Sequence, residues 1–256
     1  MIKFKNSEIT PENIYKKRRS FIKSIGLSAS TLAMSAIPFV NKSLASERDK
    51  LTSYKDITTY NNYYEFGTSK SDPHRNSQIF KTTPWDITIE GEVEKPIKLS
   101  MEEISEMFIS EERIYRLRCV EGWSMVIPWM GFSLSKLLSK VNPTNKAKFV
   151  EFESVYDPAQ MKGQRYPVLN WPYNEGLRID EAMHPLTTVV TGLYGKKLPN
   201  QNGAPLRIFI PWKYGFKSAK AIVKIKFVEN MPTSSWMWAS PRAVSYTHLR
   251  AHETKT

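Results

Sequence analysis

The single cysteine of the 256-residue chain, Cys119, lies where a strand-like pattern ends. Tyr115, Leu117 and Cys119 alternate with Arg116 and Arg118, so the cysteine shares one strand face with the first two residues, and the arginines share the other. The alternation stops just after the cysteine, which predicts a thiol at the junction of a strand and a loop. Nearby cations favour the thiolate and lower the pKa of a thiol, and a thiolate is a ligand for soft metals. A free cysteine also commonly packs as a small apolar side chain, so this pattern alone leaves both interpretations open.

Two cationic segments in the last third of the chain could bind an anion. The segment NGAPLR, residues 202–207, places Arg207 on the strand face opposite Leu206 and Ile208, just after a glycine turn. The segment PWKYGFKSAK, residues 211–220, brings three lysines and a glycine into one predicted loop. Backbone N–H groups together with Arg and Lys side chains can form a phosphate cradle, although a solvated basic loop is the plainer interpretation. The spacing matches neither a Walker nor a Rossmann motif, which argues against a nucleotide.

Two further features have both a binding and a structural interpretation. The segment YNNYYEFG, residues 60–67, gathers aromatic and amide side chains without periodicity, as in a loop that packs on a ligand or on the core. His184 precedes Pro185 and could in principle bind a metal. No second histidine or carboxylate stands at metal-ligand spacing from it, so we expect a hydrogen-bonded structural histidine.

The periodicities predict many short strands and few helices. The pattern Ser100-x-x-Glu103 is a capping box, which predicts a helix over residues 100–108. Residues 46–83 and 156–185 are expected to be mostly irregular, with one helical turn near residues 180–183. We expect a second short helix over 132–141 and strands over 84–93, 114–119, 146–154, 186–194, 204–210 and 219–228. The fold class is therefore a β-rich α+β domain with short helices.

The first 45 residues have the composition of an export signal. A basic stretch KKRRSFIK, residues 16–23, precedes a mildly apolar run over 24–40 and the small-residue sequence Ser43-Leu44-Ala45. The apolar run is short and interrupted by Pro38, which argues against a membrane anchor. The paired arginines resemble a twin-arginine signal, the route that exports folded proteins. We expect a periplasmic protein, with the signal cleaved near Ala45.

The net charge and the cysteine content of the exported chain argue against nucleic-acid binding and favour a bound cysteine. Residues 1–45 carry eight basic and two acidic residues, so without them the net charge falls from +12 to +6. No Lys/Arg block with interleaved aromatics follows residue 50, so no nucleic-acid binding is expected. One cysteine can form no internal disulfide, and its thiol would meet oxidants unless it were buried or bound. Export in the folded state also suggests a cofactor inserted in the cytoplasm, and both points favour Cys119 as a ligand.

Several long motifs occur together in one order and resemble a known family. They are YNNYYEFG (60–67), RLRCVEGWSMVIPWMGF (116–132), NGAPLR (202–207) and PWKYGFKSAK (211–220). These segments resemble the molybdopterin-containing catalytic subunits of periplasmic protein-methionine-sulfoxide reductases, which have the sulfite oxidase fold. The resemblance extends from the twin-arginine signal to about Trp238. It implies a sulfite-oxidase-type molybdopterin-binding domain.

The resemblance also implies a set of site residues and a cofactor, Mo-molybdopterin. Cys119 would supply the protein thiolate to molybdenum and would be the catalytic residue. The family often has other small residues at positions 154 and 218, so contacts at these positions would run through the main chain. The residues implied to hold the pterin and its phosphate are Asn61, Tyr64, Glu65, Ser154, Asn202, Arg207, Ser218, Ala219 and Lys220.

The activity implied by the resemblance is oxygen-atom transfer that reduces methionine sulfoxide residues in proteins, a lesion that needs repair. The expected partners are a haem-containing membrane subunit, as electron donor, and oxidised periplasmic proteins, as substrates. No CxxCH haem attachment motif occurs in this chain. Two alternatives remain open. One is a sulfite-oxidase-like or small S- or N-oxide-converting molybdoenzyme, and the other is a cofactor-free periplasmic binding protein with a buried structural Cys119.

The C-terminal end of the chain departs from the family pattern. After Trp238 the family continues with residues that pack beside the active site, whereas here the chain reads ASPRAVSYTHLRAHETKT. This tail has no periodicity and resembles translated adapter sequence, so we expect no role for His248 or His252. The expected organisation is an export signal over residues 1–45, a molybdopterin-binding oxidoreductase domain over 46–239, and a non-family tail over 240–256 that is artefactual or disordered.

Overall fold

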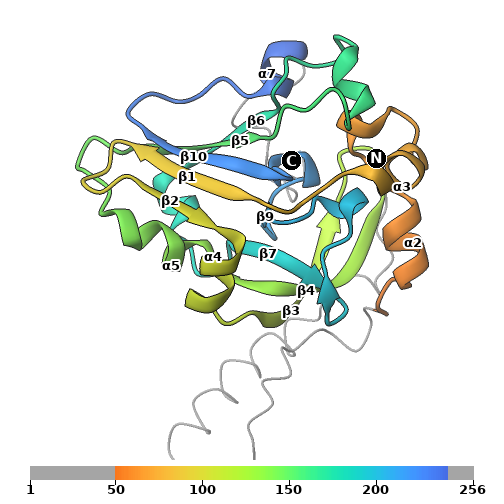
Figure 1. The fold of residues 1–256 in the computed structure, drawn as a ribbon, viewed down its shortest axis with the longest axis horizontal. Helices are drawn as coiled ribbons and strands as arrows, with labels where there is room; N and C mark the ends of the chain where they lie inside the picture. The colour runs from red at the N-terminus through yellow and green to blue at the C-terminus, as the bar shows by residue number, and fades with distance from the viewer. Residues whose placement is uncertain (1–49, 242–256) are drawn as a thin grey trace, which may run out of the picture. The chain divides into compact units, whose positions relative to one another are not determined.

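Two β-sheets form the frame of residues 50–241, the part of the chain that the computed structural model describes (Figure 1). The expected export signal and almost all of the expected tail lie outside these residues. The first sheet has the order β2-β1-β10-β5-β6 and comprises β1 (Asp86–Gly91), β2 (Ile97–Ser100), β5 (Phe149–Ser154), β6 (Asn174–Arg178) and β10 (Ile222–Val228). The second has the order β3-β4-β7-β8, with β9 also paired to β7, and comprises β3 (Glu111–Arg118), β4 (Ser124–Ser133), β7 (Thr188–Leu193), β8 (Lys196–Lys197) and β9 (Arg207–Phe209).

The helices that accompany the sheets are all short. In Figure 1, α4 and α5 lie along one side of the sheets, and α2 and α3 lie at the opposite end. The α-helices are α2 (Tyr54–Thr59), α3 (Asp72–Asn76), α4 (Met101–Met107), α5 (Leu134–Leu138), α6 (Ile179–Ala182) and α7 (Ser235–Ala239). The 3-10 turns are η2 (Tyr64–Phe66), η3 (Ser77–Ile79), η4 (Ser139–Val141), η5 (Lys162–Arg165), η6 (Asn200–Asn202) and η7 (Gly215–Lys217). None of the helices in residues 50–241 is both long and apolar enough to span a bilayer.

Local sequence chemistry accounts for several of these elements. Ser100 caps α4 by accepting a hydrogen bond from the Glu103 N–H, and the Glu103 carboxylate accepts one from the Ser100 N–H, which confirms the predicted capping box. Along β5 the buried positions alternate with half-buried ones, because one strand face packs on the core. β1 and β10 pair in parallel, although they are far apart in the chain.

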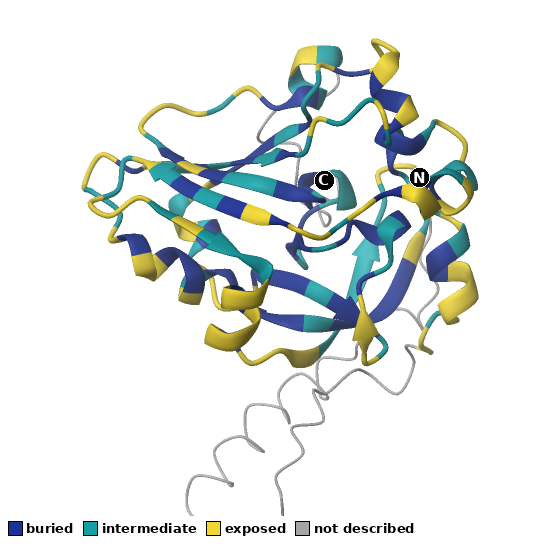
Figure 2. Cartoon of the chain, viewed as in Figure 1, coloured by how far each residue is buried: buried dark blue, intermediate teal, exposed yellow. Residues whose placement is uncertain are grey.

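The two sheets enclose a large apolar core, and a smaller cluster covers the other face of the second sheet. Dark blue positions mark the buried residues in Figure 2. The large core joins Ile225 and Phe152 of the first sheet to Phe132 and Val189 of the second. On the opposite face, the smaller cluster is formed by Ile57, Met125, Ile127, Trp129, Val190, Leu193, Leu198, Ala204 and Phe209. The second sheet is therefore buried on both faces at its centre.

Four observed strands, β2, β4, β6 and β8, were not expected from the sequence. β4 occupies the segment after Cys119, where we expected a loop, and its residues from Met125 to Trp129 are all buried. A strand that is buried on both faces reads as a continuous apolar run without alternation. β6 lies inside the 156–185 stretch that we expected to be irregular, and it pairs with β5 along its whole length. The β-rich α+β class and the six predicted strands, which correspond to β1, β3, β5, β7, β9 and β10, are confirmed, with shifted ends.

Candidate active site

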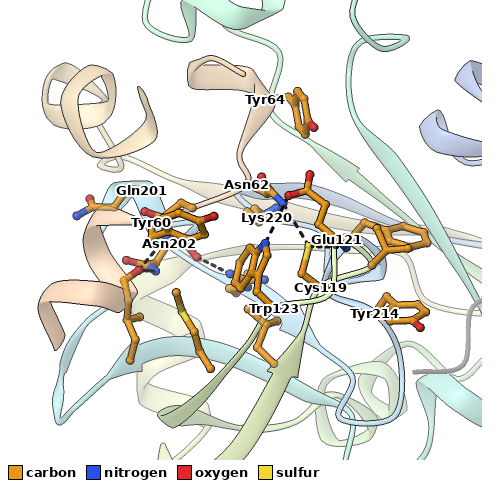
Figure 3. Close-up of a pocket in the computed structure, with 18 of the residues that line it drawn as sticks. Tyr60, Asn62, Tyr64, Cys119, Glu121, Trp123, Gln201, Asn202, Tyr214 and Lys220 are labelled. Atoms are coloured by element: carbon orange, nitrogen blue, oxygen red, sulfur yellow. Dashed lines mark hydrogen bonds between the residues drawn. The ribbon is translucent and has the colours of Figure 1, made fainter. Parts of the chain in front are cut away.

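A cavity of about 340 Å³ opens on the face of the second sheet that carries the smaller cluster (Figure 3). Its walls are mostly apolar, and its volume suits a small organic ligand. Three distant parts of the chain supply most of the lining, namely residues 57–65, 117–129 and 201–220. Among the expected site residues, the lining includes Cys119, Asn61, Tyr64, Glu65, Asn202, Arg207 and Lys220.

Cys119 lies in the turn that joins β3 to β4, at the end of the strand as the sequence predicts. The Cys119 N–H donates to the Trp123 carbonyl at 2.8 Å, and the Gly122 N–H donates to the Cys119 carbonyl at 3.1 Å. Gly122 has a φ of +86°, a left-handed conformation that favours glycine. The glycine therefore allows the tight turn that presents the thiol to the cavity.

The electrostatic environment of Cys119 differs from the sequence-based expectation. Burial raises the pKa of the thiol, the Glu121 carboxylate raises it further, and the Glu121 N–H, Asn62 and Lys70 lower it. The expected lowering by Arg116 and Arg118 is wrong, because the arginines occupy the other strand face; Arg116, for example, donates to Ser124. Without a metal, the thiol is therefore the favoured form, and a metal would have to displace its proton.

Four residues beside the thiol were missed by sequence reasoning. The Asn62 side-chain N–H donates to Cys119 Sγ at 3.3 Å. Lys70 forms an ion pair with Glu121 at 2.8 Å, and this lysine is the main reason why the pKa of Glu121 is lowered. Trp123 Nε1 donates to Glu121 at 3.4 Å, and its ring packs edge-on against Tyr60. The contacts of Asn62 and Lys70 join segments that are far apart in the chain, so no local pattern in the sequence could have assigned them.

Arg207 forms the buried cationic end of the cavity. This residue is 4% exposed, and its Nη1 donates to the Asn202 carbonyl at 2.9 Å. Burial lowers the pKa of Arg207 to about 10. Gly203, with a φ of +104°, permits the turn from η6 towards β9, because an added Cβ would lie 2.9 Å from the Lys220 Cβ. The predicted placement of Arg207 opposite Leu206 and Ile208 is confirmed.

Two asparagine amides are held by one carbonyl at the end of α2. Asn61 Nδ2 and Asn202 Nδ2 donate to the Ile57 carbonyl at 2.8 and 3.0 Å. This shared acceptor fixes the direction of both amides and leaves the two Oδ1 atoms buried without partners. Both side chains line the cavity, so each can accept a hydrogen bond from a ligand there.

Glu65 and Lys220 are two buried groups of opposite charge in the cavity wall, and each shifts the pKa of the other. Burial raises the pKa of Glu65 to about 7, while Lys220 acts in the opposite direction. Burial lowers the pKa of Lys220 to about 8, and Arg207 lowers it too, whereas Glu65 raises it. Gly163 lets η5 approach this wall closely, because an added Cβ would lie 1.9 Å from the Tyr64 carbonyl oxygen.

The titration of Glu65 predicts how stability depends on pH in the cofactor-free chain. The pKa of Glu65 is about 7 in the folded protein and about 4.5 in the unfolded chain, so folding favours the protonated carboxyl. The stability that this preference contributes is fully present below about pH 4.5 and is lost as the pH rises through about 7. Between about pH 5 and about pH 7, the Tm of the wild type should fall by at least about 3 °C more than that of Glu65→Gln. Thermal unfolding at both pH values measures this difference. Glu153→Gln, at a half-exposed carboxylate of β5, is the control that should follow the wild type. Parallel curves for wild type and Glu65→Gln would contradict the prediction.

The remaining expected site residues lie around the cavity in different ways. Tyr64 lines it and packs edge-on against Trp236 at 5.5 Å. Ser154, Ser218 and Ala219 are buried in the neighbouring strands and turn and are not part of the lining. The hydroxyls of both serines lack partners among the described residues. The structure thus brings six of the nine expected cofactor residues into one cavity with Cys119, and the cofactor-binding roles of all nine stay predictions.

The lysines of residues 211–220 do not form the cradle that the sequence suggested. Lys217 forms a buried ion pair with Glu175, and Lys213 forms one with Glu181 at 2.8 Å. Only Lys220 of the three lines the cavity. The solvated-loop interpretation is also wrong, because Lys213 and Lys217 are buried. The first two lysines therefore anchor the loop, and the third faces the ligand site.

His184 has the structural role that we expected. Its Nδ1 accepts a hydrogen bond from the Leu186 N–H at 3.2 Å, and its ring packs edge-on against Trp212. No group of three or more His, Cys, Asp or Glu side chains in residues 50–241 is arranged to hold a metal ion. Ser240, at the start of the expected tail, lines the cavity, and residues 242–256 lie outside the described part of the chain.

The polar atoms of the cavity fit a molybdopterin. Four lining residues carry a buried side-chain atom without a hydrogen-bond partner: Asn61 Oδ1, Asn202 Oδ1, Arg207 Nε and Trp129 Nε1. Unpaired buried donors and acceptors are rare in folded proteins, and here both kinds occur together between apolar walls. A flat heterocycle with an anionic phosphate would satisfy both kinds, and the thiol of Cys119 is a suitable ligand for its metal.

Comparison with known proteins agrees with this fit. A family model described as "Oxidoreductase molybdopterin binding domain" matches residues 74–236. The chain is 51% identical over 244 residues to the protein-methionine-sulfoxide reductase catalytic subunit MsrP of Xanthomonas axonopodis pv. citri, covering 90% of this chain and 76% of that protein. It is 49% identical over 257 residues to the MsrP of Burkholderia mallei, covering 94% of this chain and 78% of that protein.

A solved structure supports the fold independently of close sequence similarity. The sulfane dehydrogenase SoxCD from Paracoccus pantotrophus matches with a TM-score of 0.53 at 14% identity, over 82% of this chain and 58% of that one. At this identity the match bears on the fold alone. Together with the family model, the level of identity to the two MsrP proteins shows that the chain belongs to the family of protein-methionine-sulfoxide reductase catalytic subunits and binds Mo-molybdopterin.

Proposed function

We propose that this protein reduces methionine sulfoxide residues in proteins to methionine. The observation that carries the proposal is the identity of about half of all positions with MsrP proteins over nine-tenths of the chain. The site is consistent with this activity, because a single thiol lies in the wall of a cavity that can hold the cofactor. The net reaction converts a sulfoxide, two electrons and two protons into a thioether and water.

Bound molybdopterin supplies the two-electron oxygen-atom transfer, and the residues of this chain hold the cofactor and orient the substrate. Cys119 would hold the metal through its thiolate, with Asn62 donating a hydrogen bond to the sulfur. Asn61, Asn202 and Arg207 would hold the organic part through their unpaired atoms. Amide and guanidinium groups that are already fixed by backbone carbonyls lose little freedom when the ligand binds.

The mouth of the cavity provides a suitable surface for a methionine side chain. Tyr60, Trp123 and Tyr214 gather around Cys119 in the view of Figure 3. Tyr60 is 43% exposed, and Val120, next to the thiol, is 62% exposed, so this side of the cavity is open to a polypeptide. Methionine sulfur atoms pack favourably against aromatic rings. The aromatic side chains would therefore hold the product thioether and the methyl group of the sulfoxide.

Assays with three substrates test the proposed function. We expect the purified, cofactor-loaded protein with a chemical electron donor to reduce methionine sulfoxide in oxidised casein, and to reduce dimethyl sulfoxide less efficiently. Sulfite oxidation tests the sulfite-oxidase-like alternative. Activity with sulfite alone would overturn the proposed function, although the protein would remain a molybdoenzyme. The cofactor-free binding-protein alternative receives no support, because the chain belongs to a molybdopterin-binding family.

The name of the relatives describes a catalytic subunit, which implies a partner that supplies electrons. We propose a haem-containing membrane subunit as that electron donor, and oxidised periplasmic proteins as substrates. The open mouth beside Val120 is the part of the cavity that a protein substrate can reach. The sequence contains no CxxCH motif, the signal for covalent attachment of a c-type haem.

We also propose that the protein acts in the periplasm after twin-arginine export, with its signal cleaved near Ala45. The double variant Arg18→Lys/Arg19→Lys should leave the uncleaved protein in the cytoplasm, because the signal is read through its arginine pair. Cell fractionation with immunoblotting measures this. Lys16→Arg, which keeps the pair and the charge, is the control and should be exported normally. Unchanged periplasmic amounts of the double variant would rule out this route.

A further inference from the structure

The buried guanidinium of Arg207 lacks a carboxylate partner. Its two terminal nitrogens donate to backbone carbonyls, to Asn202 at 2.9 Å and to Ser218 at 3.5 Å, and its Nε has no acceptor among the described residues. No salt bridge joins it to an acidic side chain of residues 50–241. A buried charge is costly unless an opposite charge compensates it. The cavity beside Arg207 is therefore suited to an anionic group.

Trp129 is in direct contact with this guanidinium. Arg207 Cζ lies 5.2 Å from the centre of the Trp129 ring, a cation–π distance, and the ring of Phe209 packs at 5.1 Å. Trp129 is 1% exposed, lines the cavity, and carries an Nε1 without a hydrogen-bond partner. The phenyl ring and the guanidinium thus fix the orientation of an indole whose only polar atom is an unused donor.

Other tryptophans of the protein have hydrogen-bond partners for their indole nitrogens. The indole nitrogens of Trp85 and Trp171 donate to backbone carbonyls at 2.9 Å, and that of Trp123 donates to Glu121. Trp129 is the one tryptophan in residues 50–241 whose Nε1 is both fully buried and unpaired. An unpaired buried N–H costs free energy, and a ligand acceptor in the cavity would remove that cost.

We propose that Trp129 is a further cofactor-binding residue, whose indole N–H donates to the phosphate of molybdopterin next to Arg207 Nε. Both are donors without acceptors, the guanidinium adds positive charge, and the two side chains are in contact. A phosphate oxygen can accept from several donors at once, and charge-assisted bonds of this kind are the stronger ones. This inference concerns the cofactor and is independent of which sulfoxide or other substrate the enzyme reduces.

Binding of inorganic phosphate to the cofactor-free full-length chain tests the proposal. Phosphate should raise the Tm of the wild type, because it binds the folded state. In Trp129→Phe, which keeps an aromatic ring but lacks the N–H, the apparent affinity for phosphate should fall about 10-fold. Trp85→Phe is the matched control, since it removes a structural N–H outside the cavity, and its affinity should equal that of the wild type. Equal phosphate affinity in wild type and Trp129→Phe would overturn the proposal.

The loaded enzyme provides a second readout. The rate at which the pterin dissociates after dilution of the loaded enzyme can be measured through the fluorescence of the released pterin. This rate should be about 10-fold higher for Trp129→Phe than for the wild type or Trp85→Phe. If faster release resulted only from the loss of a buried structural indole N–H, Trp85→Phe would also release the pterin at a changed rate. If Trp129→Phe does not fold, the NMR resonances of the indole N–H groups in the wild-type protein test the proposal instead. The Trp129 resonance should shift downfield on cofactor loading, and an unchanged resonance would overturn the proposal.

Discussion

Replacement of Cys119 by serine is expected to remove molybdenum from the protein and to reduce sulfoxide reduction to below about 1% of the wild-type rate. A serine hydroxyl keeps its proton at neutral pH and so cannot supply the anionic ligand that a cysteine thiolate offers to the metal. Cys119 is the single cysteine of the chain, so no other thiol can replace it. Metal analysis of the purified variant, after co-expression with cofactor biosynthesis, measures the effect.

Val120→Ala is the control for this experiment, because it alters the exposed neighbour of Cys119 in the same turn. The control should retain about one molybdenum per chain, as should the wild type. The hydrogen bonds that join backbone groups within the turn do not involve the sulfur, and a serine oxygen can accept from the Glu121 N–H as Sγ does, so Cys119→Ser should fold with a Tm close to that of the cofactor-free wild type. A Cys119→Ser protein that still carried one molybdenum per chain would refute the assignment of Cys119 as the metal ligand.

Replacement of Lys217 by methionine is expected to lower the free energy of unfolding by about 3–5 kcal/mol. Lys217 and Glu175 form an ion pair in which both side chains are fully buried, and the variant leaves the carboxylate of Glu175 without its cation. Glu175 also interacts with Tyr173, whose hydroxyl donates to the Phe216 carbonyl at 2.6 Å. The pair thus fixes the turn that leads to Lys220, and the variant should also retain less cofactor. Chemical denaturation and pterin content measure the two effects.

Two further variants separate the buried charge from general packing. The double variant Lys217→Met/Glu175→Met should recover most of the lost stability, because neither charge remains buried. Lys224→Met breaks a half-exposed pair with Glu153 at 3.6 Å and should cost less than about 1 kcal/mol. If Lys217→Met were no more destabilising than Lys224→Met, the buried pair would not be the anchor of this turn.

The sequence predicted the parts of the fold in which one strand face or one helix end has a local signature. The capping box at Ser100 and the alternation along β5 are of this kind, and both elements form where expected. β4 could not be recognised, because a strand that is buried on both faces has no alternation. β6 contains Glu175, a residue type that is usually exposed, and so its sequence does not look like that of a buried strand. Glu175 is buried because it forms an ion pair with Lys217, which the sequence alone does not show.

The site shows the same limit at the level of single residues. Cys119 and Arg207 could be selected from the sequence, because a unique thiol and a cation on an apolar strand are visible in one segment. Asn62 contacts Cys119 across 57 positions, and Lys70 contacts Glu121 across 51. The lysines at 213, 217 and 220 look alike in the sequence, and only the folded chain separates the two that pair with carboxylates from the one in the cavity.

The residues that surround the cavity are distributed from Ile57 to Ser240, nearly the full length of the described chain. A nascent polypeptide that ended near residue 200 would contain Cys119 and Asn61 but would lack the cationic end at Arg207 and Lys220. Such a chain could offer a thiol to the metal but no compensation for the phosphate. Cofactor insertion therefore requires that the chain be synthesised and folded at least as far as Lys220, so the prosthetic group binds late in the maturation of the protein.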